Sequence, residues 1–417
     1  QMLLSDATLR AFRGGKTAKG GTLFVSSGRY YLEGEERSGA DVNLVVTQSG
    51  NVIVNPGADI AVGQGLTDRD GNAYGNMGAF ALDRFADGGF DSLSLGGKYF
   101  PGASPIRFGG NVSFKGRIDL NVKGALRLAA GGIVTADSAV NISASYLAIG
   151  QDFLTPQNPD DAPYIPFVHN STSTNYVTNF APTSGSGRLN LNAGMIDVGT
   201  LSLQGIGSAS FRADGGDIRG NGTLSAVGDI VLNAERIYPT TASSFSVFAY
   251  DPVGSKGSVT IRSNGSNEDI PLSAGGALSI QASNIIQNGV LLAPLGSITL
   301  GWDGKDLDPD DADIDSPYDA ITAGKLAVPV TQQLTLGNTS VTSVSAAGEK
   351  GSSWLAPYGN SPDGQSWIDP RGVDVTLTGL PNKSVSFSAE NLDLGDGAVV
   401  DIRGGGDIVQ ARAMPAG

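Results

Sequence analysis

The chain has 417 residues, and its composition is unusual for a globular protein: 60 glycines, 16% charged residues and no cysteine. The lack of cysteine excludes a disulfide framework and a thiolate metal site. With 41 acidic and 27 basic residues the net charge is −14, which argues against nucleic acid as a partner. An apolar fraction of 40% is ample for a core, so the low charge does not indicate disorder.

Neither terminus carries a targeting signal. Residues 1–6 lack the basic region followed by an apolar stretch that marks a signal peptide. No apolar run approaches the ~18 residues of a membrane helix, so membrane insertion is not expected. We therefore interpret the chain as an internal segment of a longer protein. Neither end shows a polar capping pattern, and exposed terminal coils are expected.

In chain order, the sequence alternates between a repetitive pattern and stretches that interrupt it. We expect β-helix coils over residues 1–62, 110–150, 188–301 and 333–417. The interruptions are an aromatic-rich insertion at 63–109, a Pro- and Asn-rich insertion at 151–187, an Asp-rich insertion at 302–332 and a loop with Trp and Tyr at 345–371. A solenoid accommodates such insertions as loops that project from a corner.

The repetitive pattern consists of short apolar-x-apolar pairs flanked by Gly, Asn, Asp or Ser. From residue 188 onward, the second apolar residues of successive pairs are separated by 20, 21, 29, 19 and 20 residues. These residues are Leu191, Phe211, Leu232, Ile261, Ile280 and Leu300. A step near 20 with one longer excursion indicates a solenoid whose loops vary in length.

This step predicts an all-β parallel β-helix. A segment of three to five residues that alternates apolar and polar side chains is a half-buried strand, which cannot bury its apolar face alone. If the chain coils about every 20 residues, equivalent strands stack in parallel about 4.8 Å apart and share one apolar column. Glycine and asparagine supply the positive φ values that sharp corners require.

Several strings resemble large exoproteins of the filamentous-haemagglutinin family. Together these strings span most of the chain, and they follow one another in the order shared with the family. The strings are ADGGFDSLSL (86–95), AERIYPTT (234–241), NIIQNGVLLAPLGSITL (284–300), LAPYGNSPDGQSW (355–367) and GAVVDIRGGGDI (397–408).

The resemblance implies a right-handed parallel β-helix that a Gram-negative bacterium exports through an outer-membrane pore, by two-partner secretion. It implies an extracellular location on the outer surface of the cell. The implied roles are adhesion to glycans or proteins of host or bacterial cells, or a passive stalk that carries a distant effector. No cofactor and no enzymatic activity are expected.

The insertions are where binding is expected, because exposed aromatic side chains give large contact areas and dominate binding hot spots. The alternative is that these rings fold back and seal the side of the rod. The candidate binding residues are Tyr74, Phe100, Tyr164, Tyr176, Trp354, Tyr358 and Trp367.

Catalytic and metal chemistry have weaker support. The acidic run with Asp306, Asp308, Asp310 and Asp313 offers oxygen ligands suited to Ca²⁺, but lacks the Gly and Glu of an EF-hand; a solvated loop is the alternative. The sole histidine, His169, is interpreted as a loop residue.

A β-helical polysaccharide lyase or hydrolase is the alternative function, since glycoside hydrolysis needs two facing carboxylates. Four aspartates near adjacent coils are the candidates for such a pair, although aspartates in these positions more often cap turns. They are Asp197, Asp214, Asp217 and Asp229.

Overall fold

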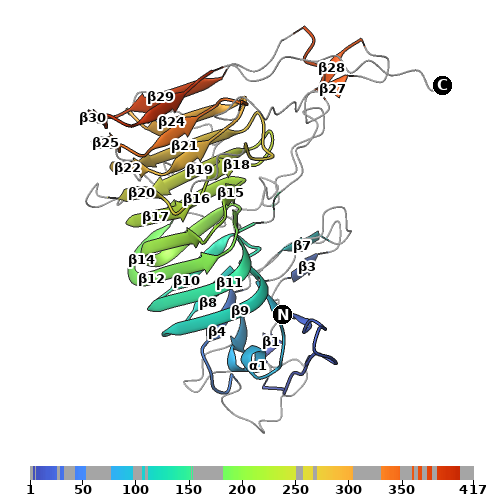
Figure 1. Cartoon of the computed structure of the whole chain (residues 1–417). Coiled ribbons are helices and arrows are strands. Elements are labelled where there is room, and N and C mark those ends of the chain that lie inside the picture. The colour runs from blue at the N-terminus through green and yellow to red at the C-terminus, as the bar shows by residue number, and fades with distance from the viewer. Residues whose placement is uncertain are drawn as a thin grey trace, which may run out of the picture.

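The computed structural model is a parallel β-helix, which confirms the fold class predicted from the sequence. Its strands lie across a long rod and climb from one end to the other (Figure 1). The structure describes residues 3–4, 6–25, 29–31, 43–52, 77–96, 106–108, 111–151, 153, 182–249, 257–265, 270–303, 330–347, 359–360, 365–368, 373–377 and 383–403. Within these residues, 27 strands form one continuous sheet that winds around the rod.

The parallel pairings divide this sheet into three stacks of strands. Stack 1 contains, in spatial order, β1 (Leu3–Leu4), β5 (Met77–Ala81), β4 (Asn43–Thr47), β8 (Asn111–Phe114), β10 (Ile133–Ala136), the start of β14 (Leu201–Ala213), β16 (Gly222–Ala226), β19 (Ser244–Ala249), β21 (Ala277–Ala282), β24 (Ser297–Gly301) and β29 (Ser384–Ser388).

Stack 2 follows stack 1 along each coil. It contains the first halves of β9 (Ile118–Leu128) and β11 (Ala139–Ile149), then β12 (Thr183–Ala193), the second half of β14, β17 (Asp229–Ala234), β20 (Ser258–Ser263), β22 (Asn284–Asn288), β25 (Gln333–Leu336) and β30 (Asn391–Leu394).

Stack 3 completes the coil. It contains β2 (Thr22–Val25), β6 (Ser92–Leu95), the second halves of β9 and β11, β13 (Ile196–Val198), β15 (Ile218–Gly220), β18 (Ile237–Pro239), β23 (Val290–Leu292), β26 (Val341–Ser343) and β31 (Val399–Asp401). Two antiparallel pairs stand apart: β3 (Arg29–Tyr31) with β7 (Ile106–Phe108), and β27 (Gly359–Asn360) with β28 (Trp367–Ile368).

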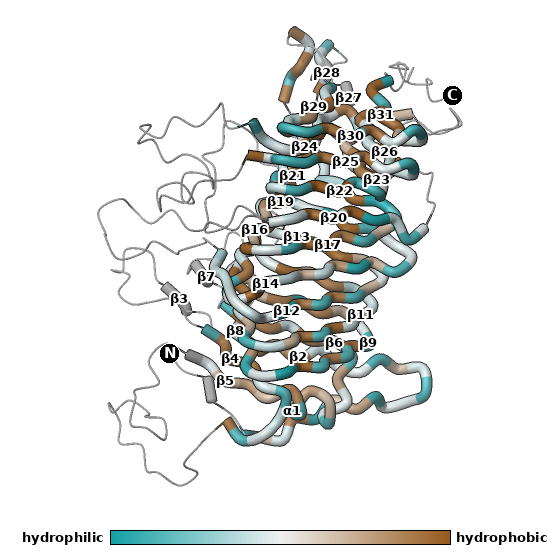
Figure 2. Tube along the Cα trace, turned by 90° about the vertical axis from the view of Figure 1, so that its left-hand side faces the viewer, coloured by the Kyte–Doolittle hydropathy of each residue, from teal (hydrophilic) through white to brown (hydrophobic). Residues whose placement is uncertain are grey.

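The core consists of columns of apolar side chains that point inward from equivalent positions of successive coils. Apolar and polar residues alternate along the strands in Figure 2, as a strand buried on one face requires. One column of stack 2 is at most 3% exposed along its length: Ile118, Val140, Leu189, Ala209, Ile230, Val259, Ile285 and Leu334. The rod is therefore held together chiefly by contacts between neighbouring coils.

The predicted 20-residue step is correct for the coil length but not for the identity of the column. Leu191, Phe211, Leu232 and Ile261 do align in stack 2. Ile280 is in stack 1, where it pairs with Leu300, and the residue that follows Ile261 in its column is Gln287. Apolar-x-apolar pairs occur in all three stacks, as in Leu278-Ser-Ile of stack 1, Leu232 with Ile230 of stack 2 and Ile196-Asp-Val of stack 3, so spacing alone does not tell the stacks apart.

Hydrogen bonds to the backbone accommodate the polar side chain of the buried Gln287 within the apolar column. Its side-chain amide donates to the backbone oxygens of Gly289 (3.1 Å) and Val341 (3.0 Å), and its Oε1 accepts from the backbone N–H of Gly289 (2.9 Å). A buried amide whose donors and acceptor are engaged in this way carries little desolvation penalty.

Residues 77–95 differ from the predicted boundaries. The sequence places them in the 63–109 insertion, but β5 and β6 pair with the coils and belong to stacks 1 and 3. Phe80 and Phe85 face the core and are only 5% and 4% exposed. Similarly, residues 183–187 begin strand β12 rather than end a loop. Aromatic density alone therefore misplaced core residues into a projecting loop.

At the N-terminal end of the described rod a short helix caps stack 2, although no polar capping pattern marks this end in the sequence. The short helix α1 (Asp83–Ala86) stands between β5 and β6, where other coils have their stack 2 strand (Figure 1). The side-chain amide of Gln48 acts like a further strand residue on the edge of β9: Oε1 accepts from the backbone N–H of Asp119 (2.7 Å) and Nε2 donates to its carbonyl (3.2 Å).

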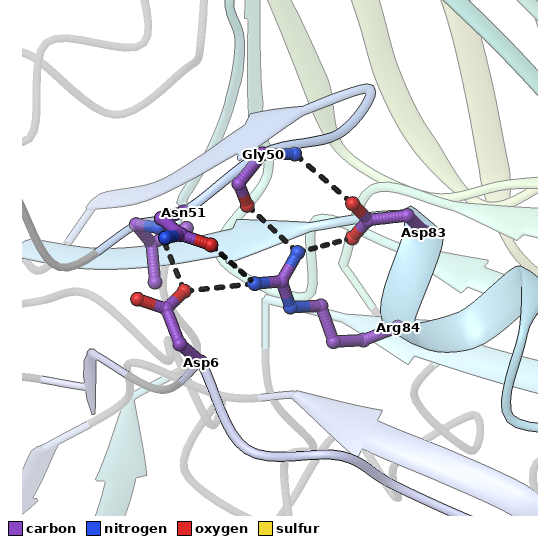
Figure 3. Close-up of polar contacts among 6 residues, drawn as sticks. Asp6, Gly50, Asn51, Asp83 and Arg84 are labelled. Carbon is purple, nitrogen blue, oxygen red and sulfur yellow. Dashed lines mark hydrogen bonds and ion pairs between the residues drawn. The ribbon is translucent and has the colours of Figure 1, made fainter.

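Arg84 of α1 fastens this cap (Figure 3). Its guanidinium binds Asp6 (2.9 Å), Asp83 (2.5 Å) and the backbone oxygen of Gly50 (2.7 Å). The carboxylate of Asp83 in turn accepts the backbone N–H of Gly50 (3.0 Å). The network joins the first residues of the chain, the turn after β4 and helix α1.

The opposite end differs. Leu392 and Leu394 of β30 occupy core positions, yet they are 47% and 54% exposed, whereas their partners Leu334 and Leu336 in the preceding coil are fully buried. The expectation of an exposed terminal coil thus holds at this end of the described rod.

Candidate binding surface

The binding and metal residues predicted from the sequence fall outside the described part of the chain. This applies to Tyr74, Phe100, Tyr164, Tyr176, Trp354 and Tyr358, to Asp306, Asp308, Asp310 and Asp313, and to His169; of Trp367 only the backbone is described, in β28. Their roles therefore remain predictions. Within the described residues, no group of three or more His, Cys, Asp or Glu side chains could hold a metal ion, and no helix has the length and apolarity to span a membrane.

A cluster of ion pairs lies on the outer side of stack 3. The guanidinium of Arg219 in β15 donates to both carboxylate oxygens of Asp197 in β13 (2.9 and 2.7 Å), and the hydroxyl of Tyr146 donates to the same carboxylate (2.6 Å). Arg219 also lies over the ring of Phe153, 5.6 Å from its centroid. Asp197 is only 5% exposed although it points away from the core.

The neighbouring coil repeats this arrangement. Arg236 donates to both oxygens of Asp217 (3.0 and 2.6 Å), and the hydroxyl of Tyr238 donates to Asp217 at 3.1 Å. Burial, together with the charge of Asp217, raises the pKa of Tyr238 to about 12. Burial and the hydrogen bond to Asp197 likewise raise the pKa of Tyr146. Both phenols therefore act as hydrogen-bond donors to fixed carboxylates.

Each of the four aspartates considered for hydrolysis is engaged by another side chain in the described structure. Asp197 and Asp217 are each engaged by an arginine through both oxygens. Asp214 accepts from Arg212, and Asp229 accepts from the hydroxyl of Ser258 at 2.5 Å. The bidentate pairing of Asp197 and of Asp217 with an arginine occupies each of these carboxylates with a structural contact.

A shallow groove of about 420 Å³, lined by polar side chains and their carbon atoms, runs over the outer face of stack 2. It crosses four successive coils, those of β9, β11, β12 and β14. Its polar lining forms two rows, each made by one residue of each strand in register. The first row is Asp119, Asn141, Asn190 and Ser210; the second is Asn121, Ser143, Asn192 and Arg212.

The first row is a directed chain of side-chain hydrogen bonds. The amide of Asn190 donates to Oδ1 of Asn141 (2.8 Å), and the amide of Asn141 donates to Asp119 (2.8 Å). Arg117 donates to both oxygens of Asp119 (2.7 and 3.2 Å). The hydrogen bonds from Arg117 and then Asn141 lower the pKa of Asp119. The row therefore presents fixed amides and no uncompensated charge.

The second row ends in another compensated pair. Arg212 forms an ion pair with Asp214, and the pKa of Asp214 is lowered, first by the hydrogen bond from Arg212 and further by one from Asn192. Within the described residues, the side chains of Asn121, Ser143 and Ser210 make no hydrogen bond. Asn121 is exposed, and Ser143 and Ser210 are half-buried in the lining of the groove.

The groove is not among the sites predicted from the sequence, although the sequence contains a signal for it. The apolar residues of its strands predict the coils, and the polar residues between them, as in Leu189-Asn-Leu-Asn, carry that signal. A run of Asn, Ser and Asp at those positions in adjacent strands is the pattern that would have indicated a polar face.

Comparison with known proteins found no matching family model, no matching curated protein and no matching solved structure. The resemblance to the filamentous-haemagglutinin family therefore remains a prediction, and the fold defines the chain as a parallel β-helical solenoid.

Proposed function

We propose that this chain is a rod segment of a secreted adhesin or stalk on the outer surface of a Gram-negative bacterium. In this proposal the protein leaves the cell through an outer-membrane pore by two-partner secretion. It attaches to glycans or proteins of host or bacterial cells, and it performs no catalysis.

The observation that carries the proposal is the solenoid itself, with its outward polar rows and insertions. A regular stack of coils builds length and surface at low cost in sequence complexity. Residues 302–332 connect β24 of stack 1 to β25 of stack 2, and residues 345–383 connect β26 of stack 3 to β29 of stack 1. The strands on either side of these connections keep their places in the stacks, so the connecting segments are free to specialise in binding.

Attachment is tested with beads that carry the purified chain, offered to epithelial cells and to bacterial cells. We expect retention of chain-coated beads over beads that carry an unrelated protein of the same net charge. Equal retention of the two kinds of bead on all cells would overturn adhesion and leave the stalk function. Secretion is tested separately, by deleting the gene of the partner pore; unchanged release of the protein would contradict that part of the proposal.

The alternative, a polysaccharide lyase or hydrolase, makes a different prediction. It requires that Asp197 or Asp217 be released from its arginine to act on a substrate. Incubation of the chain with polygalacturonate and with neutral polysaccharides, followed by a reducing-end assay, separates the two functions. Cleavage that is abolished by Asp197→Asn or Asp217→Asn would replace the adhesin proposal.

A further inference from the structure

We infer that the groove on stack 2 is a binding site for an extended, uncharged glycan that lies along the rod axis. This inference deepens the proposed adhesion, on which it rests, by naming a site and a ligand class. The site comprises the two polar rows of β9, β11, β12 and β14 defined above.

The groups in the groove suit hydroxyl-rich ligands. The side chains without a hydrogen bond, Asn121, Ser143 and Ser210, each offer both a donor and an acceptor, as a sugar hydroxyl also does. The amides of Asn141 and Asn190 keep a second N–H beyond the one used in the chain of hydrogen bonds. Asn141 and Asn190 are held in place by that chain, so little of their side-chain entropy is lost on binding.

The charges of the groove favour a neutral ligand. Asp119 is compensated by Arg117 at one end, and Arg212 is compensated by Asp214 at the other. A polyanion would find no free cation there, and it would approach a chain of net charge −14. A polycation would find both carboxylates already engaged.

The arrangement of strands favours a glycan over a peptide. Strands β11 and β12 each have hydrogen-bonded neighbours on both sides, so no strand edge is open for an added peptide strand. Equivalent polar groups recur once per coil, at the spacing of about 4.8 Å between neighbouring strands. This repeat is similar to the length of one sugar unit in an extended chain, so successive sugars meet equivalent groups.

The extent of the groove sets the length of the ligand. Along the first row, Ser210 of β14 is followed by Val231 of β17 in the next coil, so this row ends there, although the second row continues from Arg212 to Asn233. Four coils therefore define the site, which fits a glycan of about four sugars. No aromatic ring lines the groove, so binding depends on hydrogen bonds and is weak for a single chain.

The test is titration of the full chain with defined glycans by isothermal calorimetry. The probes are cellotetraose, mannotetraose and xylotetraose as neutral chains, glucose as a single sugar and a heparin tetrasaccharide as a polyanion. We expect binding of at least one neutral tetrasaccharide, and none of glucose or the heparin fragment at the same concentration. Binding of the heparin fragment alone would overturn the inference.

The decisive variant is the double substitution Asn121→Ala and Ser143→Ala, because these side chains make no hydrogen bond within the described residues and their loss leaves the fold intact. At about 0.5–1.5 kcal/mol for each hydrogen bond, it lowers the binding constant roughly tenfold. Asn190→Ala gives a loss of the same kind through the first row. Thr260→Ala is the control, because Thr260 continues the first row two coils beyond Ser210, outside the groove.

The outcomes separate the inference from the proposed function. If the chain binds a neutral glycan and the double variant binds it equally well, the glycan site lies elsewhere and only the groove assignment is overturned. If no probe binds while chain-coated beads still attach to cells, the glycan inference fails and adhesion stands. Loss of both readouts overturns both.

Discussion

Arg236→Leu tests whether the ion pairs on stack 3 contribute to the free energy of unfolding of the rod. Asp217 and Arg236 have side chains only 10% and 11% exposed, and two hydrogen bonds join them. Removal of the arginine leaves the Asp217 carboxylate buried without its counter-ion. Breaking such a buried pair costs about 3–5 kcal/mol.

The structure places the expected loss near the lower limit of that range. The hydroxyl of Tyr238 still donates to Asp217 after the substitution, and a hydrogen bond to a charged group offsets about 1.5–3 kcal/mol of the desolvation penalty. We therefore expect Arg236→Leu to lower the free energy of unfolding by about 3 kcal/mol. This is a large fraction of the roughly 5–15 kcal/mol that stabilises a typical protein.

The assay is urea denaturation followed by circular dichroism, with the slope of the transition checked for constancy. Lys115→Leu is the control, because the pair of Lys115 with Asp137 has side chains 54% and 49% exposed and is worth at most about 1 kcal/mol. Adding Asp217→Asn to Arg236→Leu removes the unpaired charge and recovers part of the loss. A loss no larger than that of Lys115→Leu, or no recovery in the double variant, would refute the reasoning.

Three further substitutions probe the core, the phenol and a coil contact. Phe211→Ala empties a fully buried position and lowers the free energy of unfolding by about 3–5 kcal/mol. Phe24→Ala, at a position 62% exposed, changes it far less. Equal losses of unfolding free energy for the two variants in urea denaturation would contradict the placement of Phe211 in the core. Tyr238 loses its proton near pH 12 in the native state but near pH 10 when unfolded, so the protein loses stability between these pH values. The Tyr238→Phe variant loses less stability over the same interval. An equal slope of unfolding free energy against pH in the two proteins would contradict the raised pKa of Tyr238. Gly216→Ala brings a Cβ into a backbone oxygen of the preceding coil and lowers the free energy of unfolding by about 1–3 kcal/mol or more. Gly14→Ala, with open space around it, is tolerated. Similar thermal midpoints for the two variants would show that neighbouring coils can move apart to make room for the added methyl group.

Much of the architecture follows from local sequence. The alternation in Leu189-Asn-Leu-Asn requires a strand that buries one face, and such a short strand needs neighbours to cover it. The 20- and 21-residue steps from Leu191 to Phe211 and Leu232 then determine the length of a coil. The fold class could be predicted because these patterns repeat within one coil and depend on no distant partner.

The candidate site could not be predicted in the same way. Asn141 and Asn190 are 49 residues apart and hydrogen-bonded, because strands β11 and β12, which precede and follow residues 151–182 in the sequence, pair directly with each other. Gln48 pairs with the backbone of Asp119, 71 residues away, and helix α1 replaces a strand at the capped end. No local pattern states which side chains a variable loop will bring into register.

The sequence by itself thus determined that the chain coils, how long a coil is and, in the regular repeats, which apolar residues face inward. The tertiary structure alone decided that Ile280 belongs to stack 1 rather than to the column of Ile261, that the Asp197 and Asp217 carboxylates are paired with arginines, and that two polar rows form a groove. The physical reason is that burial acts on each residue separately, whereas register joins residues through loops of unequal length, and only the stacked coils show where each loop returns the chain.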